Sequence, residues 1–194
     1  MKKGLENLIR NFLLRKRQSL FCSKGVGFTL IELLVVIGII GLLSTVAVVA
    51  VGNAREKAQI AKTRGDLKQL RTAIQLLEDD TGKWPNGCSI NQTANPEVYL
   101  DTQQAGINQE PVVGDQGSGC TWTALDIIRW NGPYIMTTNI KDPWDNSYVF
   151  DPDYRAYENC ATEDEQPEAA VIYSAGPNGS DLNAYDCDDI FTKL

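Results

Sequence analysis

The side chains of this 194-residue chain that could do chemistry are mainly carboxylates. Histidine is absent from the sequence, which excludes zinc sites built on imidazole and acid–base catalysis by histidine. Calcium takes about six to eight oxygen ligands from a flexible loop. The densest group of oxygen donors lies near the C-terminus and consists of Asn178, Asp181, Asn183, Asp186, Asp188 and Asp189. This segment is therefore either a calcium site or a solvated acidic loop.

Neighbouring carboxyl groups could also act as a general acid and base. Asp188 and Asp189 are such a pair, but the sequence shows no second catalytic cluster. We therefore expect no enzymatic activity. A single-pass, membrane-anchored enzyme or binding domain outside the cytoplasm is the alternative that this pair keeps open.

A lone carboxylate, Glu32, stands in a stretch long enough to cross a membrane. Residues 33–51 contain no charge and no proline, and residues 28–31 extend the apolar run on its N-terminal side. A helix needs about 20 apolar residues to cross a bilayer core. The sequence therefore predicts a membrane helix over residues 28–51. Glu32 lies either against a partner charge or in the first helical turn, where the helix dipole favours an acid.

The charges that flank this helix predict its orientation. Residues 1–27 carry seven lysines and arginines and one acid. Under the positive-inside rule, such a segment stays in the cytoplasm and the rest of the chain is sent outward. We therefore expect a single-pass protein of the inner membrane, with its head in the periplasm or at the cell surface.

The helix is predicted to continue beyond the membrane. Gly82 and Pro85 are typical of a helix end, so one helix should run from near Phe28 to near Thr81. Residues 52–85 form its amphipathic continuation. They carry an apolar stripe at helical spacing, made of Leu67, Leu70, Ile74 and Leu77.

Residues 86–194 are predicted to form a small acidic α+β head. From residue 72 onward the chain has 21 acidic and five basic side chains, which disfavours binding of nucleic acid. Residues 86–120 resemble a long connecting loop. A short helix is expected over Thr123–Trp130 with Leu125 and Ile128 buried and Ile127 as a further candidate. Strands are expected at Tyr148–Phe150 and Ala170–Ser174, as a hairpin joined through the acidic segment Asp151–Glu168.

Four cysteines follow the predicted membrane helix, at positions 88, 120, 160 and 187. An even number of cysteines in an exported domain favours two disulfides, for which three pairings are possible. We expect Cys88–Cys120, which closes the long loop, and Cys160–Cys187, which ties the acidic segment to the C-terminal loop. Four free buried thiols are the alternative.

The string GFTLIE at Gly27–Glu32 resembles the class III signal of type IV prepilins and type II secretion pseudopilins. In that family a prepilin peptidase cuts after the glycine and methylates the new N-terminal phenylalanine. The resemblance implies that residues 1–27 are a cleaved leader and that Phe28 becomes the N-methylated first residue. It also implies that Glu32 pairs with the amine of Phe28 in a neighbouring subunit and sets the register of assembly.

Later motifs look like those of the major pseudopilin of type II secretion, in the same order: DTGKWP, NGPYI, KDPWDNSYVF and YSAGPNG followed by DDI. The resemblance implies a pilin-like fold, with the long helix packed on a small antiparallel sheet. It also implies calcium in the C-terminal loop, with Asp188–Asp189 as the acidic pair and Asn178, Asp181 and Asp186 as further ligands. Two departures are the lack of proline in residues 28–51 and the length of loop 86–120.

The function implied by the resemblance is mechanical. The chain would be a subunit of a pilus-like filament that a type II secretion machine assembles for protein export. Its partners would be copies of itself, the prepilin peptidase, the inner-membrane assembly platform and the minor pseudopilins. A type IV pilin for adhesion, motility or DNA uptake is the alternative within the same architecture.

Overall fold

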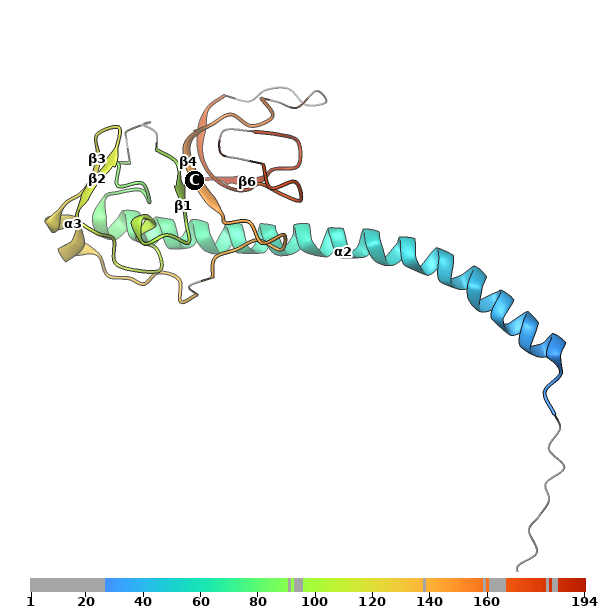
Figure 1. Cartoon of the computed structure of the whole chain (residues 1–194). Coiled ribbons are helices and arrows are strands. Elements are labelled where there is room, and N and C mark those ends of the chain that lie inside the picture. The colour runs from blue at the N-terminus through green and yellow to red at the C-terminus, as the bar shows by residue number, and fades with distance from the viewer. Residues whose placement is uncertain are drawn as a thin grey trace, which may run out of the picture. The chain divides into compact units, whose positions relative to one another are not determined.

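The computed structural model describes most of the chain after the predicted leader (Figure 1). The described residues are 27–90, 92, 96–137, 139–158, 160, 167–180, 182 and 185–194. Two compact units are present, Met1–Ala50 and Val51–Leu194. The first unit contains the beginning of the long helix, and the second contains its end together with the whole sheet.

One helix of 52 residues, α2 (Leu30–Thr81), begins in the first unit and ends in the second. Figure 1 shows α2 as one continuous helix. The absence of proline from this stretch leaves every internal backbone hydrogen bond available. The helix ends at Thr81 and is followed by Gly82, which adopts the left-handed conformation (φ 71°) and donates its N–H to the carbonyl of Glu78 at 2.8 Å. The predicted helix and its glycine stop are both confirmed.

The sheet is antiparallel and small. Its four strands are β1 (Val98–Tyr99), β4 (Val149–Tyr154), β5 (Ala169–Ser174) and β6 (Ile190–Lys193), in the order β1-β4-β5-β6. The predicted hairpin is the central pair β4–β5. The two outer strands were not predicted from the sequence.

Alternate side chains of the central strands enter two different apolar clusters, as the pleat of a strand requires. Phe150 and Ile172 are paired across β4 and β5 and pack with the buried stripe of α2. Val149 and Tyr173 are the next pair and belong to the cluster on the opposite face of the sheet. The stripe residues Leu67, Leu70, Ile74 and Leu77 are each at most 1% exposed. The predicted packing of an amphipathic helix on a sheet is therefore confirmed.

The stretch 86–120, expected to be one long loop, contains regular structure. Besides β1 it holds a 3-10 helix, η1 (Gln103–Ala105), and strand β2 (Gly114–Gly117), which pairs with β3 (Cys120–Trp122). These elements are two to four residues long, too short to show a periodicity in sequence. Tertiary contacts hold them in place: Trp122 is fully buried and donates its indole N–H to the carbonyl of Gln104 at 2.9 Å.

The short helix α3 (Ala124–Arg129) forms where it was expected, but the side chains that it buries are not the ones predicted. Leu125 is 53% and Ile128 is 80% exposed, whereas Ile127 packs against the core. The reason is the cap: Thr123 and Asp126 bond reciprocally in a capping box, and Asp126 is buried. Because Asp126 and Ile127 face inward, Leu125 and Ile128 are left on the outer side.

Candidate functional sites in the N-terminal segment and the C-terminal loop

The predicted processing site lies in an open, extended segment. Gly27, Phe28 and Thr29 precede the helix, and all three are exposed. A side chain added at Gly27 would meet no other atom within 4 Å. Nothing in the fold of the described residues therefore requires glycine at this position. A requirement for glycine there would come from another protein that handles the segment.

Glu32 closes the first turn of α2. Its Oε2 accepts the N–H of Thr29 at 2.9 Å and the hydroxyl of Thr29 at 2.7 Å, and its own N–H donates to the Thr29 hydroxyl at 3.3 Å. This reciprocal arrangement is a capping box. In a single chain, Glu32 therefore occupies the first-turn position in which an acid is stabilised by the helix dipole. Its predicted contact with a neighbouring subunit stays a prediction.

The N-terminal part of α2 is an apolar surface with no cover in the single chain. Its large apolar side chains from Leu30 to Val51 are between 46% and 86% exposed where they can be described. The described part of the chain contains one helix, α2, that is long and apolar enough to cross a membrane. An apolar surface of this size requires lipid or other apolar helices around it. The helix thus fits a membrane-anchored protein.

The motifs that carry the resemblance meet in the folded head. The Tyr134 hydroxyl of NGPYI donates to Asp80 Oδ2 of DTGKWP at 2.8 Å and accepts the N–H of Asn131 at 3.1 Å. The Trp84 ring packs edge-on against Phe150, with ring centroids 5.5 Å apart. These contacts bind the end of α2 to the sheet and to the segment after α3. The motifs therefore act through packing rather than through chemistry.

Asp142 is a buried hub that sequence analysis did not single out. Its Oδ1 accepts the N–H groups of Trp144 and Asn146, both at 2.9 Å, and its Oδ2 accepts the Ser174 hydroxyl at 2.6 Å. Asn146 in turn donates its side-chain amide to the carbonyl of Gly176 at 2.8 Å. This network ties the KDPWDN turn to the end of β5, where the C-terminal loop begins. The motif KDPWDN contains Asp142, but the sequence could not show that Asp142 contacts Ser174, which lies 32 residues away.

Replacing this hub should destabilise the head. Asp142→Asn keeps the shape of the side chain but places an amide N–H₂ among donors that need an acceptor. We expect a loss of about 2 kcal/mol or more in the free energy of unfolding, seen as a melting temperature lower by several degrees. Tryptophan fluorescence of the full chain in detergent would measure it. The matched control is Asp145→Asn, in the same turn but exposed, at a φ of 73° that asparagine tolerates. Equal losses in both variants would contradict the role of Asp142.

The C-terminal loop brings together three of the five predicted ligands. The Asn178 amide donates to Asp186 Oδ2 and to Asp188 Oδ1, both at 2.6 Å. Ser180 adds a hydroxyl bond to Asp186 Oδ2 at 2.7 Å. Burial alone would raise the pKa of Asp186, but the hydrogen bonds from its neighbours Asp188, Ser180 and Asn178 lower it. The pKa of Asp188 is raised by burial and by its interaction with Asp186.

Asp189, the fourth predicted ligand, has a different partner. Its Oδ2 accepts the hydroxyl of Tyr154 at 2.8 Å, beneath the tyrosine cluster that covers the sheet. Burial raises the pKa of Asp189 to about 6. The fifth predicted ligand, Asp181, and Asn183 beside it lie outside the described residues.

The donor set of the loop suits a hard cation, because it consists of carboxylate, amide and hydroxyl oxygens with no sulfur or imidazole. Asp186 and Asp188 are the two carboxylates that already converge, on the Asn178 amide. Among the residues that the structure describes, no group of three or more acids or cysteines is arranged to hold a metal. The loop therefore fits calcium only with a further ligand, for which Asp181 is the predicted residue.

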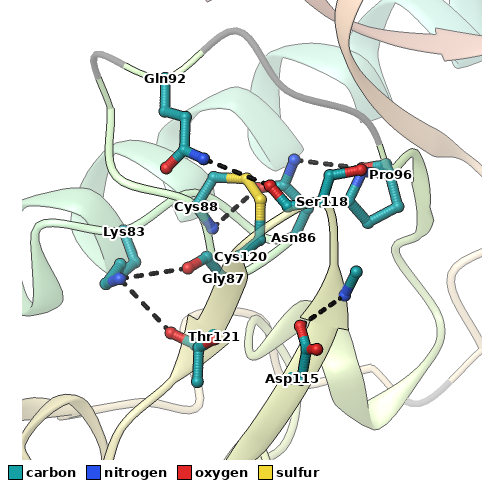
Figure 2. The surroundings of a disulfide bond; sticks show 11 residues. Lys83, Asn86, Gly87, Cys88, Gln92, Pro96, Asp115, Ser118, Cys120 and Thr121 are labelled. Carbon is teal, nitrogen blue, oxygen red and sulfur yellow. Dashed lines mark hydrogen bonds between the residues drawn. A yellow bond between two sulfur atoms is a disulfide. The ribbon is translucent and has the colours of Figure 1, made fainter.

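Two disulfides join the four cysteines of the head, in the pairings expected from the sequence: Cys88–Cys120 and Cys160–Cys187. Figure 2 shows the first of them, between the segment after α2 and strand β3. Lys83 lies beside it and donates to the carbonyls of Gly87 and Thr121 at 3.2 and 3.3 Å. The second disulfide fixes Cys187 between Asp186 and Asp188, so it anchors the C-terminal loop.

Several curated proteins are similar to this chain. The type IV major fimbrial protein FimA of Dichelobacter nodosus is 38% identical over 101 residues, which cover 46% of this chain and 64% of that protein. A probable minor fimbrial protein of the same organism is 33% identical over 92 residues, 47% of this chain and 56% of that protein. The type II secretion system core protein G of Pseudomonas aeruginosa is 33% identical over 126 residues, 64% of this chain and 71% of that protein. No protein-family model and no solved structure matches the chain.

The chain thus spans less than two thirds of the fimbrial relatives and somewhat more than two thirds of the secretion protein. These relatives are named as fimbrial proteins and as a core component of a secretion system, not as enzymes. Their names agree with the fold, in which a long apolar helix continues into a small α+β head. The chain belongs to the family of type IV pilins and type II secretion pseudopilins.

Proposed function

We propose that this protein is the repeating subunit of a type II secretion filament. The observation that carries the proposal is the extent of the match to core protein G, which covers 64% of this chain and so reaches well into the head. The matches to the fimbrial proteins cover under half of the chain. The match to core protein G therefore includes more of this chain than either of these fimbrial matches does.

A type IV pilin is the second candidate, favoured by the higher identity to FimA, 38% over the shorter stretch. The two functions predict opposite phenotypes in the native organism. Deleting the gene of a secretion subunit should leave exported proteins in the periplasm while surface fibres and twitching motility persist. Loss of fibres with normal export would show instead that the protein is a pilin.

The proposed subunit has its N-terminus in the cytoplasm, α2 in the inner membrane and its head outside. The seven basic residues ahead of the helix support this orientation. The prepilin peptidase would cut between Gly27 and Phe28, which lie in the open, extended segment, and would methylate Phe28. The exposed apolar side chains of α2 would then pack against other copies and against the assembly platform and minor pseudopilins.

Calcium in the C-terminal loop is part of the proposal. Asp186 and Asp188 would supply carboxylate oxygens, with Asp181 as the further ligand. When bound, the ion would remove the repulsion between these acids and would tie the end of the chain to the sheet. In this proposal the ion has a structural role, because it holds the loop in place at the edge of the sheet.

Calcium should therefore stabilise the head. Binding to the folded state alone adds about 2.7 kcal/mol at a hundredfold excess over Kd, which raises the melting temperature by several degrees. The full chain in detergent would be melted with calcium, with magnesium and with a chelator. Magnesium should have a much smaller effect because it keeps its water and demands stricter geometry.

The variants make this test specific to the loop. Asp188→Ala should abolish the calcium shift, and Asp164→Ala, in the neighbouring acidic segment, should leave it unchanged. Identical melting of the wild-type chain with calcium and with chelator would show that the loop is a solvated acidic turn.

A further inference from the structure

Three carboxyl groups meet inside the head, away from the C-terminal loop acids. They belong to Glu97, just before β1, and to Asp151 and Asp153 of β4. Asp151 is 0% exposed. Six buried side-chain atoms of the described residues lack a hydrogen-bond partner, and four of them are Glu97 Oε1 and Oε2, Asp151 Oδ2 and Asp153 Oδ1. Buried acids without partners are costly, so something must remove their charge.

Neither a metal nor a basic side chain accounts for this cluster in the described structure. No three acids among the described residues are arranged to hold a metal. The groups that act on Glu97 and Asp151 are other acids and the hydroxyl of Tyr185, which lowers the pKa of both but, being neutral, does not remove their charge. A proton is the neutralising group that is left.

The backbone of β4 places Asp151 and Asp153 together. The register of β4 with β5 shifts between Asp151 and Tyr154, so the strand is irregular here and brings the backbone of Asp153 to the side chain of Asp151. The N–H of Asp153 donates to Asp151 Oδ1 at 2.9 Å, which leaves Asp151 Oδ2 as the unpartnered oxygen. Burial raises the pKa of Asp151, and the nearby carboxyl group of Asp153 raises it further. One proton on Asp151 Oδ2, donated to Asp153 Oδ1, would satisfy both unpartnered atoms at once.

We propose that Asp151 holds a proton at neutral pH and donates it to Asp153 in a hydrogen bond, beside Glu97 as a third carboxyl group, and that the head loses stability as rising pH removes protons from this cluster. The cluster joins the segment before β1 to β4. It also faces the C-terminal loop, through Tyr185. Mutual repulsion of the ionised acids would therefore loosen the contact between these three parts of the head.

The direction of the pH effect follows from the electrostatics. Burial, together with the charge of Asp153, raises the pKa of Glu97 to about 7. Burial, Asp153 and Glu97 raise the pKa of Asp151 to about 7, although the N–H of Asp153 opposes the shift. Unfolded carboxyls titrate near about pH 4. Between about pH 4 and 7 the folded head thus binds more protons, so its stability falls as pH rises through this window and then levels off. The other titratable groups described beside the cluster are the tyrosines Tyr154, Tyr173 and Tyr185, and Asp189, which accepts the Tyr154 hydroxyl.

The test is the melting temperature of the full chain in detergent, followed from pH 4.5 to 8 with a chelator present so that no cation binds the C-terminal loop. The wild-type value should fall by roughly 5 °C or more. Asp151→Asn supplies a permanent N–H donor to Asp153 without a charge. This variant should melt higher than wild type at pH 8 and show a much smaller fall. Asp79→Asn, on an exposed position of α2, should keep the wild-type fall.

A second measurement does not depend on how the variant folds. Infrared spectra of the wild-type chain at pH 6 should contain the carbonyl band of a protonated carboxylic acid, and this band should disappear by pH 9. Absence of the band at pH 6, or an Asp151→Asn chain that folds and keeps the full pH dependence, would overturn the proposal. Loss of the band on adding calcium at pH 6 to the Asp188→Ala chain, whose C-terminal loop should not bind the ion, would also overturn it, by showing that the cluster binds a cation.

Discussion

Glu32→Gln should insert into the membrane and be processed, yet fail to form filaments. The side-chain oxygen of glutamine can still accept the bonds from Thr29 that measure 2.9 and 2.7 Å in the wild-type cap, so the helix should begin in the same place. What the variant lacks is the negative charge. In the proposed filament that charge pairs with the Phe28 amine of a neighbouring subunit, out of water, where an unpaired ammonium is costly. Filaments counted by electron microscopy should be absent or strongly reduced.

The matched control for this variant is Thr29→Val. Valine removes the hydroxyl of the cap but leaves Glu32 charged, so filaments should persist. If Glu32→Gln assembles normally and Thr29→Val does not, the carboxylate serves to cap the helix and not to set the register. If both assemble normally, neither role limits assembly.

The long helix and its packing could be predicted because both follow from periodicity in one continuous stretch. Leu67, Leu70, Ile74 and Leu77 recur at helical spacing, and all four are in the core. No competing signal, such as a proline, interrupts that stretch. The central hairpin β4–β5 could be located for the same reason, as a local run of apolar and aromatic residues.

The remaining strands could not be predicted, because tertiary contacts decide them. Strand β1 is two residues long and exists because Val98 pairs with Phe150, 52 positions away. Helix α3 shows the limit in another way. Its apolar residues suggested a buried face, but the capping box of Thr123 and Asp126 set its rotation and left Ile128 outside.

For the functional sites, too, the prediction depended on whether the residues of the site are contiguous in the sequence. The Gly27–Glu32 string and the C-terminal acids are contiguous, so the sequence alone could point to them. The Asp142 hub depends on Ser174, and the buried acid cluster depends on Glu97 meeting Asp151 from 54 positions away. Asp189 shows that contiguity can also mislead, because it neighbours Asp188 in sequence but bonds Tyr154 instead.

The largest effect expected on processing comes from Gly27→Leu, which should leave the leader fully attached. The fold of the described residues cannot explain a requirement for glycine, because a side chain at this position meets nothing within 4 Å. Any block must therefore arise in the active site of the peptidase, which has to fit the residue before the cut. Mass spectrometry of the membrane fraction would show a chain that begins at Met1 instead of at an N-methylated Phe28.

A control for this variant is Gly4→Leu, far from the cut within the same leader, which should be processed normally. The uncut Gly27→Leu chain should still reach the membrane, since the apolar stretch after Phe28 is intact. It should not assemble, because Phe28 would then be joined to the leader by a peptide bond and would carry no free amine for Glu32. The Gly27→Leu chain, which keeps Glu32, should therefore show the same assembly defect as the Glu32→Gln chain. A mature wild-type chain that begins at a residue other than Phe28 would contradict the predictions for both Gly27→Leu and Glu32→Gln.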